Sequence, residues 1–213
     1  MHRQEDDEDA AIELDIVGSN MVDVNPAAAA GKKVALVESA HLGGICLNWG
    51  CIPTKSLLKN AEVLELIQNS SKYGIDIKNY NVNWNKVIKR SRDIANRMGK
   101  GIQYLMKKNK IEVLNGFAKI IDKTTVEIKG EKLDTLSTNH IIISTGASAN
   151  YFSGMEPDGK NIITYKDALV LDNAPKHIVI IGAGAIGVEF AYFFNTFGSK
   201  VTIIEAQPNI LPN

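Results

Sequence analysis

The chain is poor in cysteine and has no long apolar run. Only two cysteines, Cys46 and Cys51, occur in 213 residues, which excludes a fold that is cross-linked by several disulfides. No apolar run approaches the roughly 20 residues that a membrane-spanning helix needs. The formal net charge is zero, so no global field favours nucleic acid or an anionic membrane. What remains is a globular protein of ordinary composition, with 45% hydrophobic residues.

The N-terminus carries an acidic run where a secretory signal would carry basic and apolar residues. Residues 5–9 read EDDED, and no apolar core follows them. We therefore expect residues 1–10 to form a disordered, solvated tail and the protein to be cytoplasmic. Because purely structural disulfides are rare in a reducing cytosol, the two cysteines call for a chemical role.

Two segments resemble each other and predict an α/β fold. Residues 31–38 read GKKVALVE and residues 198–205 read GSKVTIIE, and each follows a strand-like run that ends in glycine. A strand, a helix and a second strand ending in an acid make up a dinucleotide-binding unit. We expect two tandem dinucleotide-binding, Rossmann-like units, the second incomplete. The first domain would cover residues 11–147, and the second would begin at residue 148 and run to residue 213.

Helices and short strands are predicted between these units. Apolar spacing indicates helices over residues 53–70 and 84–108. The second has an inward stripe of Val87, Ile88, Ile94, Ala95, Met98, Ile102 and Leu105. Strands are expected at residues 111–114, 118–121, 125–128 and 141–146, followed by a linker over residues 147–158.

The opposite face of the helix over residues 84–108 is basic and has two interpretations. It carries Lys86, Lys89, Arg90, Arg92, Arg97 and Lys100. A nucleic-acid surface usually interleaves aromatic residues with such charges, and none occur here. A solvated helix face is therefore favoured over a nucleic-acid site.

A glycine-rich motif lies between the strand and the helix of the second unit. Residues 182–187 read GAGAIG, after a strand expected at residues 177–181 and before a helix that runs to about residue 197. Gly182 permits a tight turn, Gly184 lets a pyrophosphate approach the helix N-terminus, and Gly187 lets the helix pack on the sheet. The complete strand–helix–strand context makes this motif far more specific than an isolated one.

The acid at the end of the second unit indicates the type of nucleotide. Glu205 follows the first glycine of the motif by about 20 residues, the position of the acid that binds a ribose 2′-hydroxyl. Its carboxylate would repel a 2′-phosphate, and no arginine follows it in residues 206–208. NAD is therefore favoured over NADP. The alternative is that Glu205 is only a surface acid at a strand end.

The two cysteines flank a short segment before the helix over residues 53–70. Cys51 lies near its start, where free amides and the positive helix end would stabilise a thiolate. Cys46 lies upstream in a glycine-containing turn, near enough to form a disulfide if the chain folds back. We expect one thiol to be exposed for exchange and its partner to be held inside.

A zinc site and a chance pair of free thiols are weaker interpretations of the cysteines. Zinc could be bound by His41 with Cys46 and Cys51, but a closed site needs four ligands at short spacings. The remaining histidines are distant in sequence. The surrounding glycines, Pro53 and Lys55 favour the redox interpretation over both.

Residues 43–58 read GGICLNWGCIPTKSLL. This run resembles the redox-disulfide signature of the flavin-dependent pyridine nucleotide–disulfide oxidoreductases. Within that family it is most similar to the dihydrolipoamide dehydrogenases, whereas glutathione and mercuric reductases usually have valine after the first cysteine. The likeness extends over residues 31–213, including the run ISTG at residues 143–146 and the second glycine motif.

The resemblance implies a role for each matching residue. Cys46 would exchange with the dihydrolipoyl sulfur, Cys51 would contact the flavin, and Lys55 would lie near the flavin and pair with Glu189. FAD would be bound by Gly18, Glu38, Gly43, Gly44, Lys55, Ala118, Ser144, Thr145 and Gly146. NAD would be bound by Gly182, Ala183, Gly184, Ala185, Ile186, Gly187, Glu189 and Glu205. No metal is implied.

The implied activity is oxidation of dihydrolipoyl groups with NAD as acceptor. The partner would be the acyltransferase of a 2-oxo-acid dehydrogenase complex, and the full-length parent would be a homodimer. The alternatives are a related disulfide reductase and an inactive nucleotide-binding fragment, since nothing in the sequence matches the C-terminal domain that carries the family's catalytic His–Glu pair.

The first glycine motif departs from the family pattern. After Gly18, Asn20 and Asp23 stand where the second and third glycines are expected, and Asp23 would bring negative charge toward a pyrophosphate. Pro26 then falls inside the expected helix, where proline costs about 3 kcal/mol. These departures therefore weaken the expectation that the first unit binds FAD.

Overall fold

The computed structural model describes residues 12–18, 21–130 and 133–211, which form a mixed α/β structure with two compact units. The first unit is drawn from Met1–Gly44 and Gly99–Ala147, and the second from Ile45–Met98 and Ser148–Asn213. The chain thus passes between the units at the expected boundary after residue 147, and residues 45–98 also belong to the second unit. The acidic tail over residues 1–10 and Asn20 of the first glycine motif lie outside the described residues.

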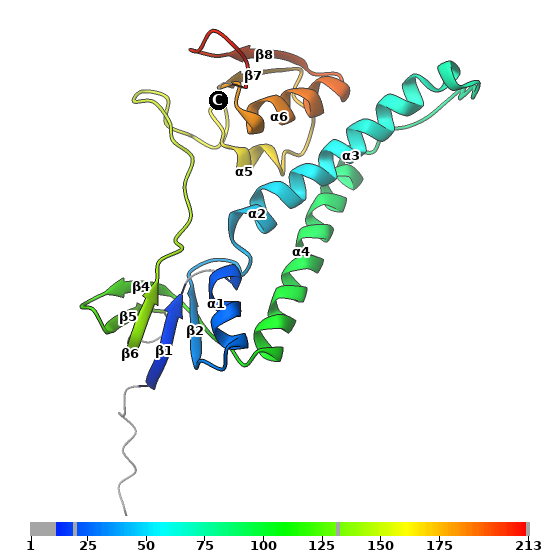
Figure 1. Ribbon diagram of the computed structural model, residues 1–213. Helices are drawn as coiled ribbons and strands as arrows, with labels where there is room; N and C mark the ends of the chain where they lie inside the picture. The colour runs from blue at the N-terminus through cyan, green and yellow to red at the C-terminus, as the bar shows by residue number, and fades with distance from the viewer. Residues whose placement is uncertain (1–11, 19–20, 131–132, 212–213) are drawn as a thin grey trace, which may run out of the picture. The chain divides into compact units, whose positions relative to one another are not determined.

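The first unit is built on a six-stranded sheet in the order β3-β2-β1-β6-β5-β4. β1 pairs in parallel with β2 and with β6, β2 pairs in parallel with β3, and the remaining pairs are antiparallel. Helix α1 packs beside β1 and β2 (Figure 1). The elements are β1 (Ile12–Gly18), α1 (Met21–Ala29), β2 (Val34–Glu38), β3 (Glu112–Asn115), β4 (Phe117–Ile120), β5 (Thr125–Lys129) and β6 (Leu133–Ile142).

The parallel strands bring several predicted site residues to one edge of this sheet. Gly18 at the end of β1 pairs in register with Ile142 at the end of β6, and Glu38 at the end of β2 pairs with Asn115. Because parallel strands point the same way, their carboxyl ends share an edge, which is where open α/β sheets bind ligands.

The core of the first unit lies around β2. Its residues Val34–Val37 are all buried, as expected for a continuous apolar strand covered on both faces. Ala35 and Val37 pack in one cluster with Val126, Ile128 and Leu136. The strand–helix–strand pattern of residues 14–38 therefore forms as predicted, with Pro26 inside α1.

The strand expected at residues 141–146 is a wrong prediction. β6 instead covers Leu133–Ile142, and residues 143–146 lie beyond the strand. The described pairing of β6 with β1 ends where Gly18 lies opposite Ile142. Residues 137–140 are polar, so the apolar pattern does not indicate the first part of the strand. One of them, Thr138, is nevertheless buried, and its hydroxyl donates to the carbonyl of His140.

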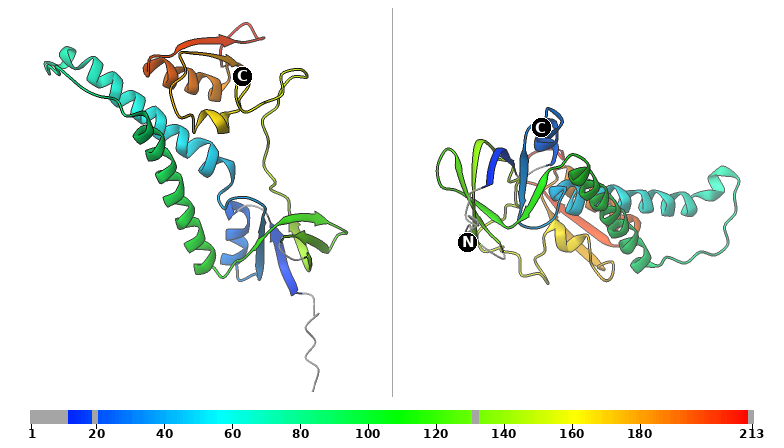
Figure 2. Two further views of the ribbon diagram at one scale, coloured as in Figure 1. Left: turned by 180° about the vertical axis from the view of Figure 1, so that it is seen from behind. Right: turned by 90° about the horizontal axis from the view of Figure 1, so that it is seen from below.

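The second unit combines helices with a two-stranded parallel sheet of β7 (His177–Ile181) and β8 (Lys200–Ile204). Helix α6 (Ala185–Thr196) connects these strands and packs against them (Figure 2). The helices that also contribute residues to the unit are α2 (Gly44–Trp49), α3 (Cys51–Gln68), η1 (Ser70–Tyr73), α4 (Trp84–Lys108) and α5 (Tyr165–Ala168).

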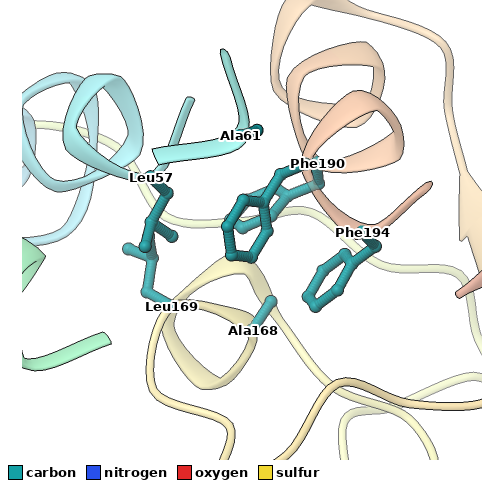
Figure 3. Packing of buried hydrophobic residues seen from close by; sticks show 7 residues of the cluster. Leu57, Ala61, Ala168, Leu169, Phe190 and Phe194 are labelled. Carbon is teal, nitrogen blue, oxygen red and sulfur yellow. The ribbon is translucent and has the colours of Figure 1, made fainter. Parts of the chain in front are cut away.

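Packing of α3 against α6 forms the core of the second unit (Figure 3). Leu57 and Ala61 of α3 meet three phenylalanines of α6, of which Phe193 is 1% exposed. Trp84 at the start of α4 adds to this aromatic group, with its ring 5.5 Å from that of Phe193, and its indole N–H donates to the Leu171 carbonyl at 2.7 Å.

The long helices agree with the predictions, with one exception. α4 has the predicted bounds, and α3 begins at Cys51, two residues before the predicted start. Met98 was predicted to face inward but is 46% exposed, whereas Met106, outside the predicted stripe, is buried. Within the described ranges, none of the helices has both the length and the apolar character required to cross a membrane.

We predict that Phe193→Ala destabilises the protein by about 3–5 kcal/mol, because it removes a buried aromatic ring and leaves a cavity. Chemical denaturation followed by circular dichroism measures this change. Phe152→Ala is the matched control, since Phe152 is 66% exposed, and we expect it to leave stability almost unchanged. Equal effects of both substitutions would contradict the assignment of the core.

Candidate functional site

The two cysteines lie at a junction of two helices. Cys46 is in α2, Gly50 caps the next helix, and Cys51 is the first residue of α3. The Cys46 thiol hydrogen-bonds to Cys51, and this bond, together with partial burial, raises the pKa of Cys46. The backbone amide of Cys51 and the charge of Lys55 act in the opposite direction on the same thiol. The two cysteine side chains are therefore near enough to interact.

Two expectations about the cysteines need correction. Cys46 lies within the helical turn of α2 and not in an irregular turn. Both thiols are free and exposed, whereas one was expected to be held inside. Cys51 is exposed because it is the first residue of α3, whose buried side chains begin two residues later, at Pro53, and on α2 the buried side chain is that of Leu47, next to Cys46.

Gly50 allows the helices to meet this closely. A Cβ at this position would lie 3.1 Å from the Cα of Cys46 and 3.1 Å from the carbonyl oxygen of Ile45. Both neighbours are backbone atoms, which cannot move aside as a flexible side chain would. A side chain at residue 50 would therefore be crowded and would force the backbone of α2 to shift by a few tenths of an ångström, and local spacing alone does not single out Gly50 for this role.

An ion pair joins the cysteine helix to the glycine-motif helix. Lys55 lies one turn after Cys51 on α3, and its ammonium donates to the carboxylate of Glu189 on α6. The side chain of Lys55 is 60% exposed and that of Glu189 is 28% exposed. A second polar bond between the same helices runs from the Tyr192 hydroxyl to Glu65 at 2.7 Å, and it raises the pKa of Tyr192.

The basic face of α4 is mostly exposed, as predicted, and two of its arginines also contact the segments around the cysteines. Arg90 donates to the carbonyl and the hydroxyl of Ser56, at 3.3 Å and 2.8 Å. Arg92 donates to the carbonyl of Asn48 at 2.7 Å. Their partners lie 34 and 44 residues away in sequence, so local spacing gave no signal for these contacts.

The glycine motif forms the turn between β7 and α6. Gly182 has a φ of 99°, which favours glycine, and its amide donates to the Ile204 carbonyl at 2.8 Å. A Cβ at Gly187 would lie 2.1 Å from the carbonyl oxygen of Gly182, so only glycine fits there. A Cβ at Gly184, the N-cap of α6, would meet no described protein atom within 4 Å. Ala185 and Ile186 complete the first turn of this helix.

Glu205 follows β8 and holds this turn. Its carboxylate accepts the amide of Ala183 at 2.7 Å and that of Gln207 at 2.8 Å. These backbone hydrogen bonds lower the pKa of Glu205, with the Ala183 amide as the largest cause. The residue is therefore more than an unattached surface acid, because it orders the backbone of the glycine motif.

The remaining predicted residues belong to the first unit. Glu38 lies at the carboxyl end of β2, and its carboxylate accepts the Ala40 amide at 2.8 Å. Gly43 and Gly44 follow with φ of 94° and 62°, values that favour glycine. The rest of the predicted positions lie at the end of β1, in β4 and after β6, and they are Gly18, Ala118, Ser144, Thr145 and Gly146.

Metal ligation is the alternative use of the cysteines. Over the ranges that the structure describes, no three or more histidine, cysteine, aspartate and glutamate side chains form a group that could hold a metal ion. Cys46 and Cys51 instead have each other and Lys55 as neighbours.

Comparisons with known proteins point to one family. Residues 20–213 match the family described as pyridine nucleotide-disulphide oxidoreductase. The chain is 44% identical to a dihydrolipoyl dehydrogenase of Chlorobaculum parvum and 46% identical to one of Zymomonas mobilis, over 87% of its own length. It spans 40% of the length of each of these relatives.

Solved structures show the same fold. The HOCl-induced flavoprotein disulfide reductase RclA from Escherichia coli matches with a TM-score of 0.76 and 29% identity, over 95% of this chain and 43% of RclA. LpdA from Mycobacterium tuberculosis matches with a TM-score of 0.83 and 19% identity, over 95% of this chain and 46% of LpdA, and this second likeness concerns the fold alone.

We predict that Gly187→Ala destabilises the protein by roughly 1–3 kcal/mol, because its Cβ would clash with the Gly182 carbonyl oxygen. Gly184→Ala is the matched control, since its Cβ has open space and its φ is −69°. We expect the control to cost less than about 1 kcal/mol. Thermal unfolding compares the two variants, and a Gly187→Ala protein as stable as the control would contradict the close helix–strand packing.

The Glu205 contact predicts a pH dependence at one backbone amide. A lowered carboxylate pKa contributes stability that is present above the ordinary value of about 4.3 and is lost as the pH falls through the folded value. We expect the protection of the Ala183 amide against hydrogen exchange, corrected for intrinsic rates, to fall on acidification and to become independent of pH in Glu205→Gln. The Gly182 amide, which donates to the Ile204 carbonyl, is the internal control. Parallel loss of protection at both amides would contradict the assignment.

Proposed function

The chain belongs to the pyridine nucleotide–disulphide oxidoreductase family and has its fold, and we propose that it carries the redox-disulfide and dinucleotide-binding part of a dihydrolipoyl dehydrogenase. The observation that carries this proposal is the contact between Cys46 and Cys51 at the start of α3. The relatives from Chlorobaculum parvum and Zymomonas mobilis, which have that name, support the choice of substrate.

The proposed reaction begins with thiol–disulfide exchange. A dihydrolipoyl thiolate attacks the Cys46 sulfur of the Cys46–Cys51 disulfide and releases Cys51 as a thiolate. The second dihydrolipoyl thiol then attacks the mixed disulfide, which gives the lipoyl disulfide and leaves Cys46 and Cys51 as two thiols. Both thiols are exposed, so Cys46 is accessible for this exchange, and its assignment over Cys51 follows the family resemblance. Cys51 would then contact the flavin, beside the Lys55–Glu189 ion pair.

For the second unit we propose an NAD site at the turn between β7 and α6. Gly182 makes the tight turn, and the space around Gly184 would let a pyrophosphate approach the amides that begin α6. Glu205 can still accept a ribose hydroxyl, because a carboxylate has more acceptor sites than its two backbone amides occupy. Together with the β1–α1–β2 unit, this gives the tandem arrangement of two Rossmann-like units.

For the first unit we propose an FAD site at the carboxyl edge of the parallel strands. Glu38 would accept a ribose hydroxyl, and the turn at Gly43 and Gly44 would line the flavin with backbone groups. FAD, when bound, supplies a two-electron carrier between the dithiol and NAD. The edge fits a dinucleotide at these positions and departs from the family pattern at Asn20 and Asp23.

The proposal extends to the partners of the full-length protein. The dihydrolipoyl group would belong to the acyltransferase of a 2-oxo-acid dehydrogenase complex, and the parent would act as a homodimer in the cytoplasm. The likeness to the flavoprotein disulfide reductase RclA favours a second candidate, a reductase of another disulfide. Assays of the full-length parent with dihydrolipoamide, glutathione disulfide and mercuric ion separate these substrates.

We predict a difference between the two cysteine variants once FAD is added. Cys46→Ser should keep a long-wavelength absorbance band, because the Cys51 thiolate would remain against the flavin. Cys51→Ser should lose the band, and the visible spectrum measures both. The opposite result would reverse the two roles, and a wild-type protein that takes up no flavin would favour a non-catalytic nucleotide-binding module.

A further inference from the structure

The segment between the two cysteines has a fixed conformation. Leu47 is buried, and Trp49 packs against the cluster formed by α3 and α6. Asn48 lies between these two residues, in the last turn of α2. Its carbonyl also accepts a hydrogen bond from a donor that is distant in sequence.

Arg92 of α4 supplies this donor and also contacts the neighbouring ring. Its Nη1 donates to the Asn48 carbonyl at 2.7 Å, and its guanidinium carbon lies 4.2 Å from the centroid of the Trp49 ring. Burial lowers the pKa of Arg92, which shows that the group is partly removed from water. Cation–π contacts strengthen when the cation is desolvated, and a planar guanidinium can stack and donate at the same time.

Trp49 is thus held from two sides, by Arg92 and by the α3–α6 cluster. The residue that follows is Gly50, which leads directly into Cys51, and Cys46 lies three residues before Trp49. A change in the position of Trp49 or Asn48 would therefore move one cysteine relative to its partner. Contact between the sulfur atoms therefore depends on the contacts of Arg92 with Asn48 and Trp49, as well as on Gly50.

We propose that Arg92 is a positioning residue for the redox pair, and that it sets how readily Cys46 and Cys51 join as a disulfide. This inference rests on the proposed function, since it concerns the same two thiols. Arg92 acts through Asn48 and Trp49, by keeping the sulfur atoms at a high effective concentration. Loss of these contacts would leave both thiols in the protein but would lower the fraction of molecules in which the two sulfur atoms are in contact.

The test is an equilibrium with glutathione. The protein dithiol reacts with glutathione disulfide to give the Cys46–Cys51 disulfide and two molecules of glutathione, and the products are counted by alkylation and mass spectrometry. The chain has only these two cysteines, so the count is unambiguous. We expect Arg92→Met to lower the equilibrium constant for disulfide formation roughly tenfold, as for loss of a hydrogen bond to a charged group.

Two further variants separate positioning from general stability. Arg92→Lys keeps the charge and one donor but loses the planar stacking surface, so we expect an intermediate equilibrium constant. Arg97→Met is the matched control, because Arg97 is an exposed arginine on the same helix, and it should leave the constant unchanged. Circular dichroism verifies that each variant is folded, and Arg92→Lys serves as the test if Arg92→Met does not fold.

A double substitution tests whether Arg92 acts through the ring. Trp49→Leu alone should lower the equilibrium constant, and the double variant Trp49→Leu/Arg92→Met should lower it by less than the product of the two single effects. Independent effects, or a wild-type value in Arg92→Met and Arg92→Lys, would overturn the inference. A wild-type protein that forms no intramolecular disulfide would instead overturn the proposed function, so the two failures are distinguishable.

Discussion

Two helices meet at Gly50, and this junction determines where the sulfur atoms of Cys46 and Cys51 lie. The two side chains touch because α2 ends and α3 begins with only one capping residue between them. A side chain at Gly50 would contact the backbone of α2. The chemistry proposed for the protein requires two thiols that can join and separate without refolding the chain, and cysteines on two consecutive helices satisfy that requirement.

Packing of α3 against α6 extends this constraint to the glycine-rich turn between β7 and α6. The same α3 that begins with Cys51 contributes Leu57 and Ala61 to the core, and the same α6 that begins at the glycine motif contributes Phe190, Phe193 and Phe194. The Lys55–Glu189 ion pair lies at the cysteine end of this packed surface. Aromatic packing and a polar contact therefore hold the two cysteines and the glycine motif within one compact unit.

Much of this arrangement could be predicted because it depends on local sequence. The motif at residues 182–187 and the bounds of α4 follow from spacing and glycine chemistry, and the structure has them as predicted. Arg92 could not be predicted, because its partner Asn48 is 44 residues away and an arginine on a helix usually faces water. α2 was missed since it has only six residues, and β6 was misplaced because polar residues interrupt its apolar pattern.

The cysteine pair and a flavin are proposed to act as one redox unit, and the function of the whole chain depends on this claim. An anaerobic titration with dithionite, after reconstitution with FAD, counts the electrons that each bound flavin and its dithiol accept together. The expected result is about twice the uptake of flavin alone, because the Cys46–Cys51 disulfide accepts an electron pair of its own. Uptake equal to that of flavin alone, in a protein whose cysteines start as a disulfide, would contradict the claim.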